Sequence, residues 1–170
     1  MEQPVKGAGR VTRLALLTAI ALTIFMVEAQ IPALTTVPGV KLGLANIVTV
    51  YVMFSMGPGD ALLVLSGRVF LGAVFSGQMM TLIYSAAGGF LSWCALILLR
   101  KLLTREQIWL ASPVAAVFHN LGQLLAAAAV LRSWAVMAYF PYLVIAAVIA
   151  GLFTGIAAQA LLRRLERIQK

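Results

Sequence analysis

Residues 61–75, ALLVLSGRVFLGAVF, place one arginine in the middle of an otherwise apolar run. A run of about 20 apolar residues is long enough to cross a bilayer as an α-helix, and such runs recur along nearly the whole chain. Because the runs are continuous rather than alternating with a period of two, they predict helices and not barrel strands. A charge such as Arg68 costs roughly 2.5–3.5 kcal/mol at the centre of a membrane helix, so its position predicts a partner, a cavity or a ligand.

The composition argues against a soluble domain and against several kinds of site. Hydrophobic residues make up 62% of the 170 residues and charged residues 11%, whereas soluble domains contain about half and about a quarter. The net charge of +8 does not indicate nucleic-acid binding, because the basic residues lie at the ends of apolar runs and no aromatic-interleaved basic patch exists. Cys94 is the single cysteine, so one chain cannot build a disulfide framework or a thiolate metal site.

The apolar runs predict an all-α membrane protein, a six-helix bundle forming a single transmembrane domain over residues 1–170. The six expected spans are 13–31, 42–56, 60–77, 79–99, 108–131 and 135–162. The basic N-terminus resembles a signal peptide, but its apolar run continues without a convincing small-residue cleavage site, so we expect a retained first helix. Between the first two spans, Pro32, Pro38 and Gly39 disfavour a helix and predict an ordered extended segment or lid.

The distribution of charge predicts the orientation of the chain. Ten of the 13 basic residues lie before the first span, between the fourth and fifth spans, or after the last. The positive-inside rule then places both termini in the cytoplasm, which requires an even number of crossings, and we expect the cytoplasmic membrane. Small residues at GxxxG spacing, such as Gly151 and Gly155, and the series from Ser85 to Ser92 predict close helix packing.

This orientation places most polar residues of the spans in the outer half of the bundle. The candidate ligand-binding residues are Glu28, Lys41, Asn46, Arg68, His119, Asn120 and Gln123. We expect Arg68 to hold an anionic group in a pocket that opens outward, with Glu28 as its counter-ion. Hydrogen bonds to the ligand are expected from Asn46, His119, Asn120 and Gln123, whereas Lys41 could steer anions or simply be a solvated helix end. A structural alternative stays open, in which Arg68 and Glu28 form an ion pair and the amides and imidazole only join helices.

The sequence lacks the residues that several kinds of chemistry require. No GxxxxGK[ST] motif is present, and one histidine with one cysteine cannot form the usual metal sites, so no metal or cofactor is expected. Prenyl transfer needs carboxylate clusters that hold magnesium against diphosphate, whereas Asp60 is the single aspartate and the four glutamates are scattered. The sequence therefore offers no catalytic residues and argues against an enzyme of these classes. Proton-coupled transport could use Glu28 or His119, although no inverted repeats are visible.

Five segments together resemble a known membrane family. They are LALLTAIALTIFMVEAQIP (14–32), KLGLANIVTVYVMF (41–54), SGRVFLGAVFSG (66–77), YSAAGGFLS (84–92) and FHNLGQ (118–123). Over about residues 13–162 the chain resembles the heptaprenyl diphosphate synthase component I family, also called the Gx transporter family. That family is similar in size and six-helix plan to the substrate-binding S-components of energy-coupling-factor (ECF) vitamin transporters.

The resemblance implies a function and a partner. S-components dock a coupling subunit through an AxxxA pattern on the cytoplasmic part of the first helix, and Ala15 and Ala19 match it. They hold substrate near the outer face, under a lid formed by the first loop. The resemblance thus implies a lipid-embedded substrate-binding subunit that captures a small molecule and works with an ATPase-bearing partner. Two alternatives stay open: an accessory subunit of isoprenoid, quinone or flavin-linked electron-transfer metabolism, and a purely structural membrane partner.

Overall fold

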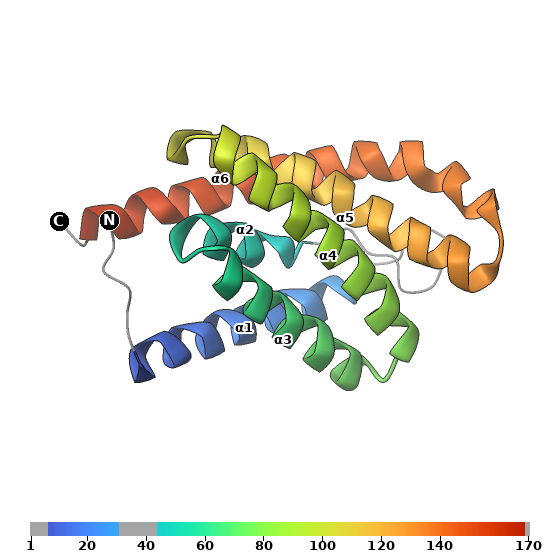
Figure 1. The fold of residues 1–170 in the computed structure, drawn as a ribbon, viewed down its shortest axis with the longest axis horizontal. Helices are drawn as coiled ribbons and strands as arrows, with labels where there is room; N and C mark the ends of the chain where they lie inside the picture. Colours follow the sequence, from blue (N-terminus) through green and yellow to red (C-terminus); the bar gives the residue numbers. More distant parts are fainter. Residues whose placement is uncertain (1–6, 31–43, 169–170) are drawn as a thin grey trace.

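The protein folds into a bundle of helices (Figure 1). The structure is a computed structural model and describes residues 7–30 and 44–168. In chain order the elements are α1 (Ala8–Glu28), α2 (Asn46–Ser55), α3 (Pro58–Ser76), α4 (Met79–Leu102), the 3-10 helix η1 (Arg105–Gln107), α5 (Ile108–Leu131), the 3-10 helix η2 (Trp134–Tyr139) and α6 (Phe140–Ile168). No strand occurs among these described residues. The prediction of an all-α chain is confirmed.

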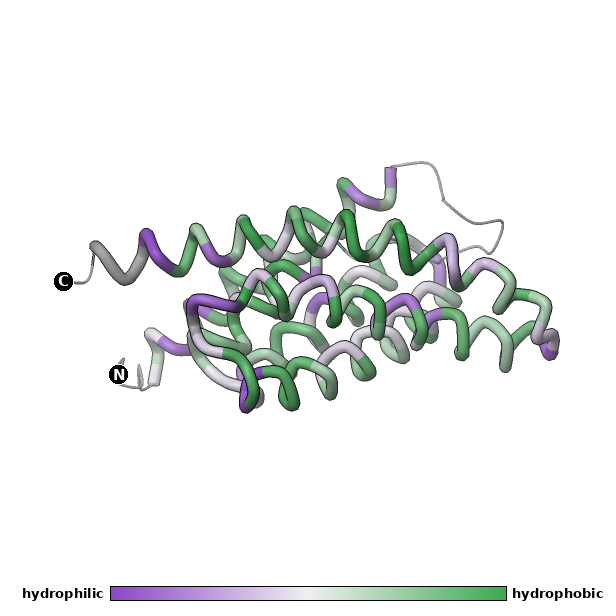
Figure 2. The backbone as a smooth tube through the Cα atoms, turned by 90° about the horizontal axis from the view of Figure 1, so that it is seen from above, coloured by the Kyte–Doolittle hydropathy of each residue, from purple (hydrophilic) through white to green (hydrophobic). Residues whose placement is uncertain are grey.

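Five of the helical segments are long and apolar enough to cross a membrane. They are Ala8–Glu28, Pro58–Ser76, Met79–Leu102, Ile108–Leu131 and Trp134–Arg164. Large apolar side chains on these helices are exposed, among them Phe75 at 64% and Phe153 at 74%, as expected for surfaces that face lipid. Figure 2 shows apolar colouring along most of each helix, with hydrophilic residues at the ends of the bundle and at a few positions between. The chain is therefore a multi-pass membrane protein.

The second expected span, 42–56, is present as a helix about half as long as a crossing needs. α2 has 10 residues and is about 15 Å long, against about 30 Å for the hydrocarbon core. Its residues Val50, Val52 and Met53 are fully buried, so α2 lies inside the bundle and packs on several sides. A helix buried on all sides is apolar all round, which explains why its sequence resembled a membrane span.

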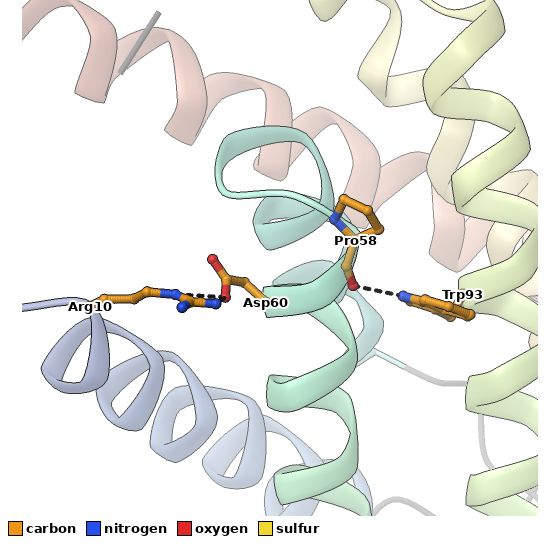
Figure 3. A network of polar contacts seen from close by, with 4 residues as sticks. All are labelled: Arg10, Pro58, Asp60 and Trp93. Atoms are coloured by element: carbon orange, nitrogen blue, oxygen red, sulfur yellow. Dashed lines mark hydrogen bonds and ion pairs between the residues drawn. The ribbon is translucent and has the colours of Figure 1, made fainter. Parts of the chain in front are cut away.

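One end of the bundle collects basic residues and will be called the basic end. The first turn of α1, the last turn of α4 and the last turns of α6 lie together there (Figure 1). Arg10 of α1 contacts Asp60 in the first turn of α3, with an Nη2–Oδ1 distance of 2.5 Å (Figure 3). The indole Nε1 of Trp93 in α4 donates to the carbonyl oxygen of Pro58 at 3.0 Å. The first contact holds the start of α3 beside the start of α1, and the second holds it beside α4.

This arrangement shows that the chain returns to the basic end between α1 and α3. α1 starts beside Asp60 and runs away from it for 21 residues, about 31 Å. α3 starts again at the basic end, because Asp60 contacts Arg10. α2 therefore lies on the returning part of the chain, between the far end of α1 and the start of α3.

Small residues allow the long helices to approach closely, as their spacing predicted. A Cβ atom added to Gly155 of α6 would lie 2.6 Å from the carbonyl oxygen of Trp109 in α5. One turn away, the hydroxyls of Ser112 in α5 and Thr154 in α6 are hydrogen-bonded at 2.8 Å. The α5–α6 pair is thus joined by close backbone packing and by a buried hydrogen bond, both of which stabilise helix pairs in lipid.

Candidate functional site

The interior of the bundle contains a group of buried polar side chains that we call the polar set. Each member is at most 4% exposed. Its members are Glu28 of α1, Asn46 and Thr49 of α2, Arg68 of α3, Ser85 and Ser92 of α4, and His119, Asn120 and Gln123 of α5. Five helices contribute to it. Because buried polar groups are unfavourable in an apolar interior unless they are paired, each member needs a partner.

Two adjacent glycines let α4 approach α5 on one side and α3 on the other. A Cβ atom on Gly88 would lie 2.6 Å from the carbonyl oxygen of His119 and 2.8 Å from Cγ of Gln123, both in α5. A Cβ atom on Gly89 would lie 2.8 Å from Cδ1 of Leu65 in α3. α4 therefore packs closely against both neighbouring helices at this level, between Leu65 and His119. The close packing is possible because the two glycines have no side chains.

Arg68 is the charged centre of the polar set. It is 2% exposed and lies eight residues along α3 from Asp60, about 12 Å from the basic end. Its positive charge interacts electrostatically with Glu28 of α1 and with the imidazole of His119. The structure therefore brings together three of the four ionisable groups that the sequence assigned to one pocket, and the fourth, Lys41, lies outside the described residues.

Several buried atoms of the polar set have no hydrogen-bond partner within the described part of the chain. For Arg68 these are Nε and Nη2, and for His119 the atom is Nδ1. Other atoms without a hydrogen-bond partner include Oδ1 of Asn46, Oγ1 of Thr49 and Oδ1 of Asn120. Most buried polar groups in folded proteins are hydrogen-bonded. A set of unpaired donors and acceptors is therefore typical of a place where a further molecule or chain segment binds.

Two amides of the polar set also connect neighbouring helices. Nδ2 of Asn46 donates to the hydroxyl of Ser92 in α4 at 3.0 Å. Nδ2 of Asn120 donates to the carbonyl oxygen of Leu143 in α6 at 3.2 Å. In both side chains the amide nitrogen serves helix packing, while the oxygen lacks a hydrogen-bond partner among the described residues. These amides thus combine the structural role with an available acceptor.

The remaining sequence predictions have different outcomes. Gln123 is buried against Gly88, beside His119 as the i, i+4 spacing predicted. Lys41 and the expected lid from Pro32 to Gly39 lie outside the described residues. Ala15 and Ala19 are exposed on the outer face of α1, where a partner helix could reach them.

Thr49, Ser85 and Ser92 are buried polar residues that the sequence did not assign to the pocket. Thr49 lies three residues after Asn46 in α2, and this spacing places both residues on one helical face. That spacing was the sequence signal that could have assigned Thr49 to the pocket. Ser92 was assigned to helix packing on its small size, and its hydrogen bond to Asn46 adds it to the polar set.

A second hollow lies at the basic end, apart from the polar set. It has a volume of about 440 Å³ and is lined by Trp109, Ile156, Gln159, Ala160 and Arg163 of α5 and α6. Its lining contains no carboxylate. The described residues also contain no group of three or more histidine, cysteine, aspartate or glutamate residues that could hold a metal ion. We take the polar set as the candidate site because it collects buried charged, imidazole, amide and hydroxyl side chains from five helices.

Comparison with known proteins places the chain in a family. The model of the heptaprenyl diphosphate synthase component I family matches residues 17–161. Because this match covers most of the 170 residues, the chain belongs to that family, and the resemblance noted from the sequence is confirmed. Every member of the polar set falls within the matched range. No curated protein and no solved structure matches the chain.

Proposed function

We propose that this member of the heptaprenyl diphosphate synthase component I family is the substrate-binding subunit of a membrane uptake system. In this proposal the chain crosses the cytoplasmic membrane six times with both termini in the cytoplasm. The polar set captures a small molecule from the outside. An ATPase-bearing partner complex then supplies the energy, because the sequence contains no nucleotide-binding loop of its own.

The observation that carries the proposal is the pair of buried Arg68 donors, Nε and Nη2, that lack a hydrogen-bond partner among the described residues. A buried charge is unfavourable unless it is paired and hydrogen-bonded. A ligand that accepts these hydrogen bonds would offset the cost of burying the charge. A purely structural role leaves these two donors unsatisfied, since the Glu28 charge attracts the guanidinium but does not accept hydrogen bonds from Nε or Nη2.

The arrangement of the helices supports the proposed topology. The chain leaves the basic end through α1 and is back there at Asp60, so α2 belongs to a second passage across the bundle. The positive-inside rule assigns an end rich in arginine and lysine to the cytoplasm. Arg68 would then lie near the middle of the membrane, on the inner side of a polar set that opens outward.

A partner-capture experiment tests this function. The tagged full chain is purified from the membranes of its own cells, and the co-purifying proteins are identified by mass spectrometry. The proposal expects a coupling protein together with an ATPase, and it expects Ala15→Trp to abolish their recovery because Ala15 is exposed at the cytoplasmic part of α1. Val27→Trp is the matched control, since Val27 is 57% exposed near the opposite end of the same helix.

A second candidate function is favoured by the description of the family. An accessory subunit of prenyl diphosphate synthesis would co-purify with an aspartate-rich synthase instead of an ATPase. The chain itself has one aspartate, and Arg10 already binds it, so the catalytic carboxylates would have to come from that partner. Recovery of a synthase without an ATPase would reject the uptake function.

A further inference from the structure

The contact between Arg10 and Asp60 shows how an arginine of this chain binds a carboxylate. Nε of Arg10 donates to Oδ1 of Asp60 at 3.0 Å, and Nη2 donates to the same oxygen at 2.5 Å (Figure 3). Nε and Nη2 lie on one edge of the planar guanidinium, where their N–H groups point in the same direction. In this contact both donors converge on one oxygen, and the same edge can also bind the two oxygens of a carboxylate with paired hydrogen bonds.

Arg68 presents the same edge in a buried place. Nε and Nη2 are the two nitrogens of Arg68 that are buried and without a hydrogen-bond partner among the described residues. A surface arginine would direct such an edge to water, but Arg68 is 2% exposed and lies between apolar helices. Both donors of this edge are therefore available to one ligand in a buried place, where a charge-assisted hydrogen bond is stronger than in water.

The chain has few carboxylates that could fill this edge. Its five acidic residues are Glu2, Glu28, Asp60, Glu106 and Glu166. Asp60 binds Arg10, and Glu106 is exposed in η1 between α4 and α5. Glu2 and Glu166 belong to the terminal parts of the sequence, and residues 31–43 contain no acidic residue at all. Glu28 interacts with Arg68 electrostatically but does not satisfy these two nitrogens.

We infer that the polar set binds a small molecule through a carboxylate group held by the Nε–Nη2 edge of Arg68. This inference rests on the proposed function and names the chemical class of its substrate. A planar carboxylate with a single negative charge matches the two parallel donors of one arginine. The other buried groups with unpaired atoms, such as Thr49 and the amide oxygens of Asn46 and Asn120, would contact polar atoms elsewhere on that molecule.

A phosphate or diphosphate group fits the same place less well. A phosphate monoester carries about two negative charges at neutral pH, and a diphosphate carries more, whereas the described polar set contains one arginine and an opposing glutamate. Proteins usually neutralise such groups with several cations or with magnesium held by carboxylates. The described residues contain no carboxylate cluster for magnesium. The geometry therefore favours a carboxylate over the diphosphate that the family description suggests.

The test identifies what co-purifies with the chain and whether Arg68 holds it. Wild-type protein, Arg68→Lys, Arg68→Ala and the control Arg164→Ala are purified as full chains in detergent. Small molecules are released with organic solvent, and half of each sample is methyl-esterified before accurate-mass spectrometry. We expect a species in the wild type that gains a methyl ester and is present at similar amounts in Arg164→Ala, because Arg164 is exposed at the basic end.

The two Arg68 variants separate the contribution of the paired donors to ligand binding from the contribution of the positive charge. Arg68→Lys keeps a positive charge but loses the paired donors, so the esterified species should fall by about tenfold. Arg68→Ala should lower it further. If Arg68→Ala does not yield helical, monodisperse protein, the lysine variant decides, because it removes the least volume and retains the charge.

Each of the other outcomes overturns a defined statement. A co-purified species that carries phosphate and no carboxyl group, and that is lost from both Arg68 variants, overturns the carboxylate inference and leaves the binding function standing. A carboxylate species retained equally by wild type and both variants overturns the role of the Arg68 edge. The absence of any species from the wild type overturns the binding function, and the inference with it.

Discussion

Replacing Gly88 by alanine tests the closest helix contact beside the polar set. The new Cβ atom would lie 2.6 Å from the carbonyl oxygen of His119 and 2.8 Å from Cγ of Gln123. The carbonyl belongs to the backbone of α5 and cannot rotate away, so α4 and α5 must separate. Overpacking of this kind costs about 1–3 kcal/mol, while alanine favours a helix over glycine by about 1 kcal/mol. Because the obstacle is backbone, we expect a net loss of about 1–2 kcal/mol.

The assay is unfolding of the detergent-solubilised chain, followed by circular dichroism during a denaturant titration. Gly59→Ala is the matched control, because a Cβ atom there meets nothing within 4 Å and should leave stability unchanged or raise it by up to about 1 kcal/mol. Gly89→Ala should fall between the two, since its obstacle is the end of the Leu65 side chain at 2.8 Å, which can rotate. Equal stability of Gly88→Ala and Gly59→Ala would refute the close approach of α4 to α5.

Three further changes test other parts of the structure. Asp60→Asn should lower the unfolding free energy by at most about 1 kcal/mol, because Arg10 is half exposed; additivity with Arg10→Gln in a double-mutant cycle would contradict the ion pair. Asn46→Leu should cost about 1–3 kcal/mol, since it leaves the buried hydroxyl of Ser92 without its donor, and denaturant titration should detect no loss if that bond is absent. Ala15→Trp should change stability by less than about 0.5 kcal/mol, because Ala15 is exposed; a larger loss in the same titration would place Ala15 inside the bundle.

The long helices could be predicted from the sequence because a helix that crosses lipid requires a run of about 20 apolar residues. The expected span 108–131 has the bounds of α5, Ile108–Leu131, and the other long spans differ from their helices mainly at the ends. α2 shows the limit of this reasoning. Apolar residues indicate that a segment avoids water, but they do not distinguish a helix that faces lipid from one surrounded by other helices. Its residue Val50 is buried by protein, which only the fold reveals.

The members of the polar set could largely be predicted, whereas their pairings could not. Depth along each span placed Arg68 and His119 at similar levels, because helix rise converts residue number into distance. The rotation and the register of one helix against another depend on packing, which the sequence does not state. The hydrogen bond from Asn46 to Ser92 is therefore a finding of the structure. The role of Gly88 as the contact for His119 is another.

The most direct test of the account is an experimental structure of the full chain, purified without stripping bound small molecules and resolved well enough to show the guanidinium of Arg68. The account predicts density that belongs to no residue of the chain, within hydrogen-bond distance of Nε and Nη2, with helices α3, α4 and α5 around it. If a backbone carbonyl or the carboxylate of Glu28 instead occupies that edge, Arg68 serves to hold the helices together, and its role in substrate binding is contradicted.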